Sequence, residues 1–188
     1  MTNRTLVVSI DALITADIPV LKQLPNLGRV MEHASWITDI ECVYPTLTYP
    51  CHATIATGCW PDRTGINNNE IPDFFAKGRM DWYWWREAIP VPTVVDFARQ
   101  AGLTASTVTW PVMCASGAEY NIGEIWAPRE EDDPTPWFTR ANSPAVAKIF
   151  EANKHMLRWM KTPQMDEFAA KCAADIIRAH RPDLMLLH

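Results

Sequence analysis

Short apolar runs that end in a polar residue are the feature that most constrains the fold of this chain. Residues 5–10 read TLVVSI and lead directly into Asp11, and the chain closes with RPDLMLLH at 181–188. Runs of this length and composition are typical of strands that are buried on both faces of a parallel sheet. With helix-like segments between them, they predict an α/β fold whose largely parallel sheet is flanked by helices.

Segments with helical spacing alternate with these runs. Apolar residues recur at helical spacing between 19 and 33, and a second helix is expected to begin at Thr48 and to be closed by Gly58. Strands are expected at 35–43 and 103–110, and further helices at 93–100, 144–160 and 164–180. The segment 111–143 is expected to be mostly loop. The irregular composition of residues 60–90 predicts a functional loop with a small hairpin around MDWYWW. The loop and hairpin are expected to form an insertion at about 66–90.

Composition excludes several classes of protein. The 188 residues carry 17 basic and 22 acidic side chains, a formal net charge of −5, which argues against bulk nucleic acid as a partner. No apolar run approaches the roughly 18 to 20 residues that span a membrane, and the N-terminus has no signal-peptide pattern. The five cysteines form no CxxC pair, so a reduced, cytoplasmic setting is expected. No feature indicates an oligomeric state.

Two residues stand where ligands bind in open parallel sheets, beyond the carboxyl ends of strands. Asp11 follows the first strand-like run, although a helix cap or turn residue is the plain alternative. Thr48 lies in PTLTYP at the expected start of a helix, where backbone N–H groups and the helix dipole favour an anion. The local pattern alone favours an N-cap role for Thr48, and Thr46 is a rival for either role.

Two segments together carry a resemblance to a known family. SIDAL at 9–13 and YPTLTYPCHATIATGCWPDRTGINNN at 44–69 resemble the nucleotide pyrophosphatase/phosphodiesterase branch of the alkaline phosphatase superfamily. WYWW at 82–85, the segment 89–112 and YNIGEIW at 120–126 look like bacterial members of that branch. The resemblance implies that residues 1–188 are the N-terminal part of a single alkaline-phosphatase-like catalytic domain.

The resemblance also assigns roles to site residues. It implies that Thr48 is the nucleophile, that Asp11 is a metal ligand, and that Asn69 helps to hold a phosphate oxygen, with Asn67 and Asn68 as close rivals. Tyr49 matches an aromatic position that stacks a nucleobase in relatives, and packing against the helix is its alternative. Candidates for the opposite wall of such a base site are Trp110, Tyr120 and Trp126.

The sequence departs from the family pattern at several positions, but the residues with assigned roles are retained. The family's Asp-Gly is Asp11-Ala12 here, and the usual P-N-H has become Pro50-Cys51-His52. Arg63 and Thr64 stand where relatives often have a histidine. Alanine after Asp11 reduces backbone freedom but keeps the carboxylate.

The resemblance implies a metal-dependent hydrolysis of phosphodiester or nucleotide pyrophosphate bonds in small molecules. Two divalent metal ions, expected to be zinc, would activate the Thr48 hydroxyl, and a covalent phospho-threonine would form. A phosphonate hydrolase of the phosphonoacetate type is an alternative within the same superfamily. A non-catalytic fragment or binding module is a third reading.

The metal ligands decide between these readings. A two-metal site needs about six protein ligands, mainly Asp and His, and only Asp11 and Thr48 are placed by the resemblance. The remaining ligands are therefore expected outside the present chain. A reduced site that uses His52 and His188 is the rival, although a structural hydrogen bond is the expected role of His52.

Overall fold

The computed structural model describes the chain except for residues 1–2, 39, 73–80, 128, 130–131 and 159–162. The chain divides into two compact units, one formed by Met1–Ser9 with Val43–His188 and the other by Ile10–Cys42. Assignment of both units to a single catalytic domain stays a prediction. Within the described residues, no helix has the length and apolarity needed to cross a bilayer.

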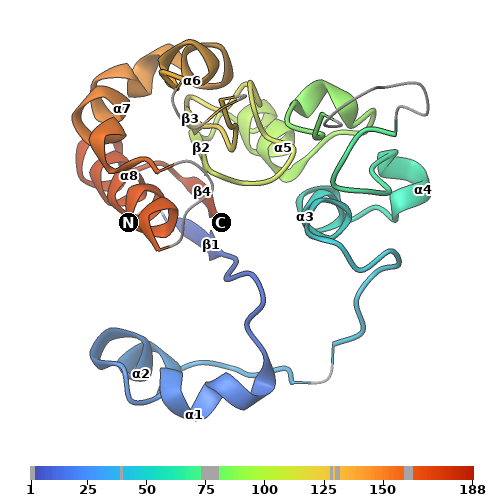
Figure 1. The fold of residues 1–188 in the computed structure, drawn as a ribbon. Coiled ribbons are helices and arrows are strands. Elements are labelled where there is room, and N and C mark those ends of the chain that lie inside the picture. The colour runs from blue at the N-terminus through green and yellow to red at the C-terminus, as the bar shows by residue number, and fades with distance from the viewer. Residues whose placement is uncertain (1–2, 39, 73–80, 128, 130–131, 159–162) are drawn as a thin grey trace. The chain divides into compact units, whose positions relative to one another are not determined.

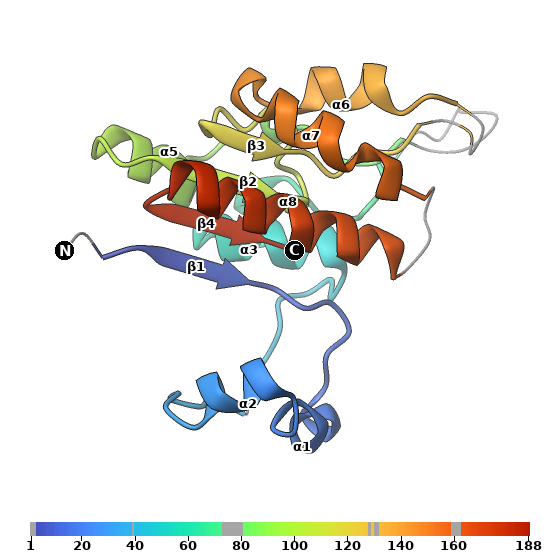
Figure 2. The same cartoon turned by 90° about the vertical axis from the view of Figure 1, so that its left-hand side faces the viewer.

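A four-stranded sheet forms the centre of the larger unit. Its strands are β1 (Thr5–Val8), β2 (Ala105–Val108), β3 (Tyr120–Ile122) and β4 (Leu184–Leu187). Their order across the sheet is β1-β4-β2-β3, and all three neighbouring pairs are parallel (Figure 2). The predicted α/β class with a parallel sheet is confirmed.

The central strand β4 is buried on both faces, as its unbroken apolar sequence predicts. Met185 belongs to the core on the side of helix α8 (Gln164–His180), whereas Leu184 and Leu186 pack with residues of helices α3 (Thr48–Thr57) and α5 (Val94–Gln100). Successive side chains of a strand point to opposite faces, which explains the division. Helices therefore cover both faces of the sheet (Figure 1).

The long helix α8 supplies the largest apolar surface on its side of the sheet. Its buried residues recur at helical spacing: Phe168, Ala169, Cys172, Ala173 and Ile176. Phe168 also contacts the rings of Phe138 and Phe150, which belong to α6 (Thr135–Ala141) and α7 (Ala147–Asn153). The remaining helical turns of this unit are short: α4 (Pro61–Thr64), η2 (Arg86–Ala88), η3 (Pro144–Val146) and η4 (Lys154–Met156).

The first strand departs from its prediction. TLVVSI was expected to be buried on both faces, but Leu6 is 52% and Val8 is 50% exposed, so this expectation is wrong for β1. The reason is its place in the sheet: within the described residues β1 pairs with β4 on one side, at the end of the strand order.

The smaller unit is helical. It contains η1 (Thr15–Asp17), α1 (Ile18–Leu21) and α2 (Pro25–Met31), which lie in or next to the segment 19–33 with helical spacing. The strand predicted at 35–43 is wrong, because the described residues of that segment form no regular strand. Ile37 and Ile40 are 77% and 75% exposed there, so no core holds the segment extended.

The loop predictions have mixed outcomes. The predicted hairpin is represented by an antiparallel bridge between Glu70 and Trp82, while residues 73–80 lie outside the described part of the chain. The segment 111–143, expected to be mostly loop, contains β3 and α6. The single helix predicted at 144–160 is divided into η3, α7 and η4 over its described residues.

A carboxylate fixes the start of α5 and the loop before it. The Asp96 carboxylate accepts hydrogen bonds from the Thr93 N–H (2.7 Å), the Thr93 hydroxyl (2.8 Å) and the Arg86 guanidinium (2.6 Å). The Thr93 hydroxyl oxygen accepts from the Asp96 N–H, which completes a capping box. Partial burial raises the pKa of the Asp96 carboxyl, but the hydrogen bonds from Arg86 and Thr93 outweigh it and leave the pKa below its usual value.

We expect Asp96→Asn to lower the free energy of unfolding by about 1–3 kcal/mol at neutral pH, because hydrogen bonds to a charged acceptor are lost. The lowered pKa makes this contribution complete above the pKa of the unfolded chain. It disappears as the pH falls through the lower pKa of the folded protein. Urea unfolding of both proteins across this pH range measures the difference, with the exposed Glu87→Gln as control. A difference that does not shrink on acidification would contradict the ionised cap.

Candidate active site at the carboxyl edge of the sheet

The residues that follow three strands lie together at one edge of the sheet. Each donates its backbone N–H to the neighbouring strand: Ser9 to Leu187 (2.8 Å), His188 to Val108 (3.1 Å) and Thr109 to Ile122 (2.8 Å). The Thr109 hydroxyl also donates to the His188 carbonyl (2.5 Å). These bonds extend the parallel ladder past the strand ends and fix the edge where ligands bind in open α/β sheets.

Thr48 is the first residue of α3. The preceding Leu47 is extended (φ −124°, ψ 158°) and its carbonyl accepts the N–H of Cys51, so the helix begins at the predicted residue. Thr48 is half-buried. Its hydroxyl therefore stands on the first turn of a ten-residue helix, at the positive end of the helix dipole.

The rival Thr46 is in a different environment. It is exposed and precedes the helix, and its hydroxyl donates to the Val43 carbonyl three residues earlier (3.0 Å). Such a bond is a local turn contact. The geometry therefore favours Thr48 over Thr46 for a role at the helix start.

Asn69 is tied directly to the start of α3. Its side-chain oxygen accepts the backbone N–H of Tyr49 at 3.0 Å, and its own backbone carbonyl accepts the N–H of Tyr83 at 3.1 Å. Because the oxygen is the acceptor, the amide N–H groups are the part of this side chain that can bind an anionic oxygen. The structure thus brings Asn69 beside the residue that follows Thr48.

The two rival asparagines have other positions. Asn68 accepts the backbone N–H of Asn69 through its side-chain oxygen (2.9 Å), and Asn67 is exposed. Of the three, Asn69 is the one with a hydrogen bond to α3. This geometry supports the assignment of Asn69 by spacing, while its function stays a prediction.

Tyr49 is part of the core. Its side chain is 0% exposed, its ring lies edge-on to Trp82 (5.3 Å) and Trp84 (6.1 Å), and its hydroxyl donates to Glu124 (3.0 Å). Burial, and then the charge of Glu124, raise the pKa of the Tyr49 phenol well above its usual value. These contacts favour the packing alternative for Tyr49, and stacking on a nucleobase stays a prediction.

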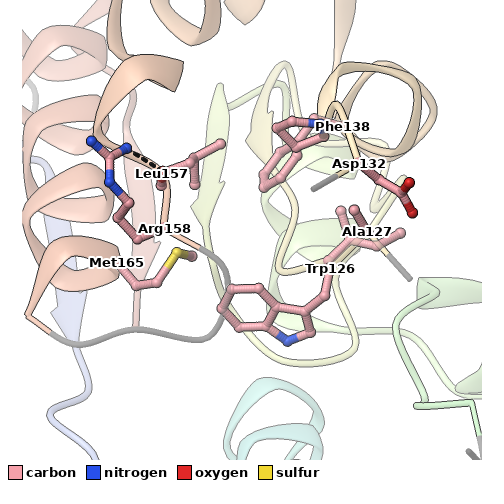
Figure 3. A pocket seen from close by; sticks show the side chains of 9 residues that line it. Trp126, Ala127, Asp132, Phe138, Leu157, Arg158 and Met165 are labelled. Carbon is pink, nitrogen blue, oxygen red and sulfur yellow. Dashed lines mark hydrogen bonds between the residues drawn. The ribbon is translucent and has the colours of Figure 1, made fainter. Parts of the chain in front are cut away.

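The three candidates for the opposite wall differ in exposure. Trp110 is fully buried and donates its indole N–H to the His52 carbonyl (3.3 Å), and the half-buried Tyr120 stacks on the His180 ring (4.2 Å). Trp126 is half-buried and lines a cavity of about 70 Å³ (Figure 3). Trp126 is thus the candidate that borders open space.

This cavity is largely apolar. Its charged side chains are Asp132 and Arg158, and its other lining residues are Ile125, Trp126, Ala127, Pro134, Phe138, Leu157 and Met165. The Arg158 guanidinium donates to the carbonyls of Leu157 (2.7 Å) and His155 (2.8 Å). Arg158 is therefore already bound to backbone, and the cavity gives no independent sign of a phosphate site.

Asp11 lies in the smaller unit. It is exposed, and its carboxylate accepts the N–H of Ala12 at 3.0 Å. Ala12 has a φ of +56°, in the left-handed region that favours glycine. The conformation explains why a glycine suits this position in the family pattern, and it shows that alanine adopts the same turn here.

The described residues contain no clustered group of metal ligands. Among them, no three His, Cys, Asp or Glu side chains come together in a group that could hold a metal ion. The Asp11 carboxylate and the Thr48 hydroxyl are suitable oxygen donors, but they are two of the several ligands that a two-metal site requires. The oxygen chemistry of each donor is compatible with a divalent metal ion, and the role of both residues as ligands stays a prediction.

Two contact residues of this edge were not assigned from the sequence. Ser9 accepts or donates a hydrogen bond at His52 (2.8 Å), and Glu124 accepts one from Tyr49 (3.0 Å). Both lie in segments that carry the resemblance, SIDAL and YNIGEIW. Their positions in those motifs are the only sequence signal that could have found them, because their partners are distant along the chain.

These features together define a class of protein. A parallel sheet covered by helices on both faces, with a threonine at the start of a helix at its carboxyl edge, is an α/β fold of the alkaline-phosphatase-like kind. The chain belongs to the type I phosphodiesterase/nucleotide pyrophosphatase family, whose sequence pattern matches residues 5–188.

Relatives of this family match the chain at low identity. Venom phosphodiesterase 2 of Crotalus adamanteus is 26% identical over 174 residues, which cover 88% of this chain and 17% of the venom enzyme. Human bis(5'-adenosyl)-triphosphatase is 27% identical over 114 residues, which cover 57% of this chain and 24% of that relative. The chain thus spans a minor part of the length of these relatives.

Solved structures share the fold. Phosphonoacetate hydrolase from Sinorhizobium meliloti 1021, in complex with phosphonoacetate, superposes with a TM-score of 0.66 and 19% identity, over 99% of this chain and 46% of that chain. Murine ectonucleotide pyrophosphatase/phosphodiesterase 5, an inactive threonine-to-alanine variant in complex with AMP, superposes with a TM-score of 0.55 and 18% identity, over 98% and 42%. At these identities the likeness establishes the fold.

We expect the 188-residue chain by itself to bind fewer than two zinc ions tightly, because its described residues bring too few donors together. Equilibrium dialysis followed by elemental analysis measures the stoichiometry. The amount of zinc bound per chain should fall in Asp11→Asn. It should not change in Asp62→Asn, which alters another exposed aspartate. Two tightly bound ions per chain would show that the ligand set is already complete.

Proposed function

We propose that the complete protein containing this chain hydrolyses phosphodiester or nucleotide pyrophosphate bonds in small molecules, with Thr48 as the nucleophile. The observation that carries the proposal is the joint placement of Thr48 and Asn69. Thr48 opens α3, and the Asn69 side chain is hydrogen-bonded to the next residue of that helix. A nucleophile and a donor for phosphoryl oxygen are thereby held on one helix terminus.

The proposed chemistry is a double displacement at phosphorus. The Thr48 hydroxyl gives its proton to water and its oxygen attacks phosphorus. The bond from phosphorus to the leaving oxygen breaks, and that oxygen takes up a proton from water as the leaving group departs. The product is a phospho-threonine ester, which water then hydrolyses to restore the hydroxyl. The Asn69 amide N–H groups and the helix dipole would stabilise negative charge on the non-bridging oxygens as it develops.

Two bound divalent metal ions, which we propose to be zinc, would lower the pKa of the attacking hydroxyl and neutralise charge on the phosphoryl group. The family typically uses two metals. In this chain the Asp11 carboxylate and the Thr48 oxygen are the proposed ligands. The cytoplasmic setting expected from the cysteines stays part of the proposal.

The comparisons support this reading at the level of the family. A murine relative binds AMP in an inactive threonine-to-alanine form, which accords with a nucleotide substrate and an essential threonine. Phosphonoacetate hydrolysis is the second candidate, because the phosphonoacetate hydrolase fold superposes with the higher TM-score, 0.66 against 0.55. In the protein containing this chain, phosphonoacetate hydrolysis would use the same helix terminus.

A substrate panel separates these candidates. The complete protein is assayed with a chromogenic nucleotide diester, a phosphate monoester and phosphonoacetate, after loading with zinc. The proposal expects the diester to have the highest kcat/KM and a chelator to abolish turnover. Preference for phosphonoacetate would replace the proposed substrate class, and absence of turnover on all three would favour a non-catalytic role.

We expect Thr48→Ala to abolish diester turnover in the complete protein while it stays folded, because the attacking oxygen is lost. Thr46→Ala is the matched control and should be much milder, since that hydroxyl donates to the Val43 carbonyl in a local turn. Steady-state kinetics and circular dichroism of both variants provide the measurement. If Thr48→Ala keeps more than a tenth of the wild-type kcat, Thr48 is not the nucleophile. If Thr46→Ala loses more kcat than Thr48→Ala, Thr46 is the nucleophile instead.

We expect Asn69→Ala to lower kcat by about 10²–10³, the usual effect of losing one donor to a developing oxyanion. The exposed Asn67→Ala is the control and should leave kcat near the wild-type value. Because Asn69 also accepts the Tyr49 N–H, thermal unfolding must accompany the kinetics. A larger effect at Asn67 or Asn68 would mean that a different asparagine holds the phosphoryl oxygen.

A further inference from the structure

His52 links the start of α3 to the first strand. The residue lies on α3 one turn after Thr48, and its side chain is buried, with 4% exposed. Its Nδ1 lies 2.7 Å from the Thr48 carbonyl oxygen, and its Nε2 lies 2.8 Å from the Ser9 hydroxyl. Both ring nitrogens are thus engaged, one with the proposed nucleophile's own peptide and one with the residue that follows β1.

The chemistry of these two partners fixes the roles of the ring nitrogens. A carbonyl oxygen can only accept, so Nδ1 must carry a proton and donate to Thr48. In the neutral ring Nε2 is then the acceptor, and the Ser9 hydroxyl donates to it. The arrangement is a directed chain from Ser9 through His52 to Thr48.

The same ring contacts residues that follow two further strands, β2 and β4. It lies edge-on to Trp110, after β2, with ring centres 5.0 Å apart, and to His188, after β4, at 4.4 Å. Trp110 also donates its indole N–H to the His52 carbonyl (3.3 Å). His52 is therefore a point at which α3 touches the ends of β1, β2 and β4 together.

We propose that His52 is a positioning residue that sets the place of Thr48 relative to the carboxyl edge of the sheet. The inference rests on the proposed function and goes beyond it, because it names what holds the nucleophile. His52 acts through the Thr48 backbone and through Ser9, which stands two residues before the proposed ligand Asp11. It is neither a metal ligand nor a group that touches the reacting atoms.

A positioning role has a kinetic signature. Misplacement of reacting groups by about 1 Å can cost as much as 10²-fold in rate. The loss falls on kcat, because the contacts that bind the substrate remain. A group that merely stabilised the fold would instead lower the amount of active enzyme and the unfolding temperature.

The test uses the complete protein with the variants Ser9→Ala, His52→Asn, His52→Ala and the double variant Ser9→Ala/His52→Ala. Asparagine can place an amide N–H near the position of Nδ1, so it keeps a donor for the Thr48 carbonyl. The control is Thr57→Ala, which removes a hydroxyl bond to the Ala53 carbonyl (2.7 Å) at the far end of the same helix. Kinetics, thermal unfolding and zinc content are measured for each.

We expect His52→Ala to lower kcat by about 10- to 100-fold with KM nearly unchanged and the zinc content retained. His52→Asn should recover part of the loss, and the double variant should be no slower than His52→Ala, because Ser9 and His52 act as one unit. Thr57→Ala should keep the wild-type kcat. Ser9→Ala preserves packing best, so it carries the test if His52→Ala fails to fold, with an expected fall in kcat.

The outcomes distinguish this inference from the function on which it rests. If Thr48→Ala abolishes turnover while Ser9→Ala and His52→Asn both keep the wild-type kcat, the positioning role is wrong and the nucleophile stands. Loss of zinc in His52→Ala would overturn the inference by making His52 a ligand. If Thr48→Ala retains turnover, the proposed nucleophile fails, and the positioning role fails with it.

Discussion

The parallel pairing of β4 between β1 and β2 is the constraint on which the rest of the larger unit depends. This strand joins segments that are nearly the whole chain apart, because Thr5 pairs with Leu184. Burial of β4 on both faces makes its register costly to change, since a shift of one residue would exchange its two sets of side chains. The residues that follow three strands consequently lie at one edge with their backbone N–H groups hydrogen-bonded: Ser9, Thr109 and His188.

Helix α3 is held against this edge by bonds to three distant segments. Asn69 accepts a backbone N–H of the first turn, Glu124 accepts the Tyr49 hydroxyl, and Ser9 bonds to His52. Each partner is far from the helix in sequence, so the position of Thr48 is determined by the tertiary structure. Fixed placement of a nucleophile is what lowers the entropic part of a reaction barrier. The contacts thus connect the packing of the core with the proposed chemistry.

The division into two units separates the two proposed metal-binding residues. Thr48 belongs to the larger unit, and Asp11 stands in the smaller one, two residues after Ser9. The left-handed conformation of Ala12 turns the chain directly after the Asp11 carboxylate. The proposal that both residues bind metal rests on the family relation.

The sequence alone determined the α/β class, the position of α3 and the spacing that leads to Asn69. The first two follow from local patterns, namely an apolar run typical of a buried strand and a helix-like stretch closed by Gly58. The spacing to Asn69 rests on the family resemblance of two motifs. The sequence did not determine that TLVVSI lies at a sheet edge, that 35–43 is irregular, or that Tyr49 is wholly buried. The tertiary structure decided these points, because burial depends on which distant segments pack against a strand or ring, and a local pattern does not record them.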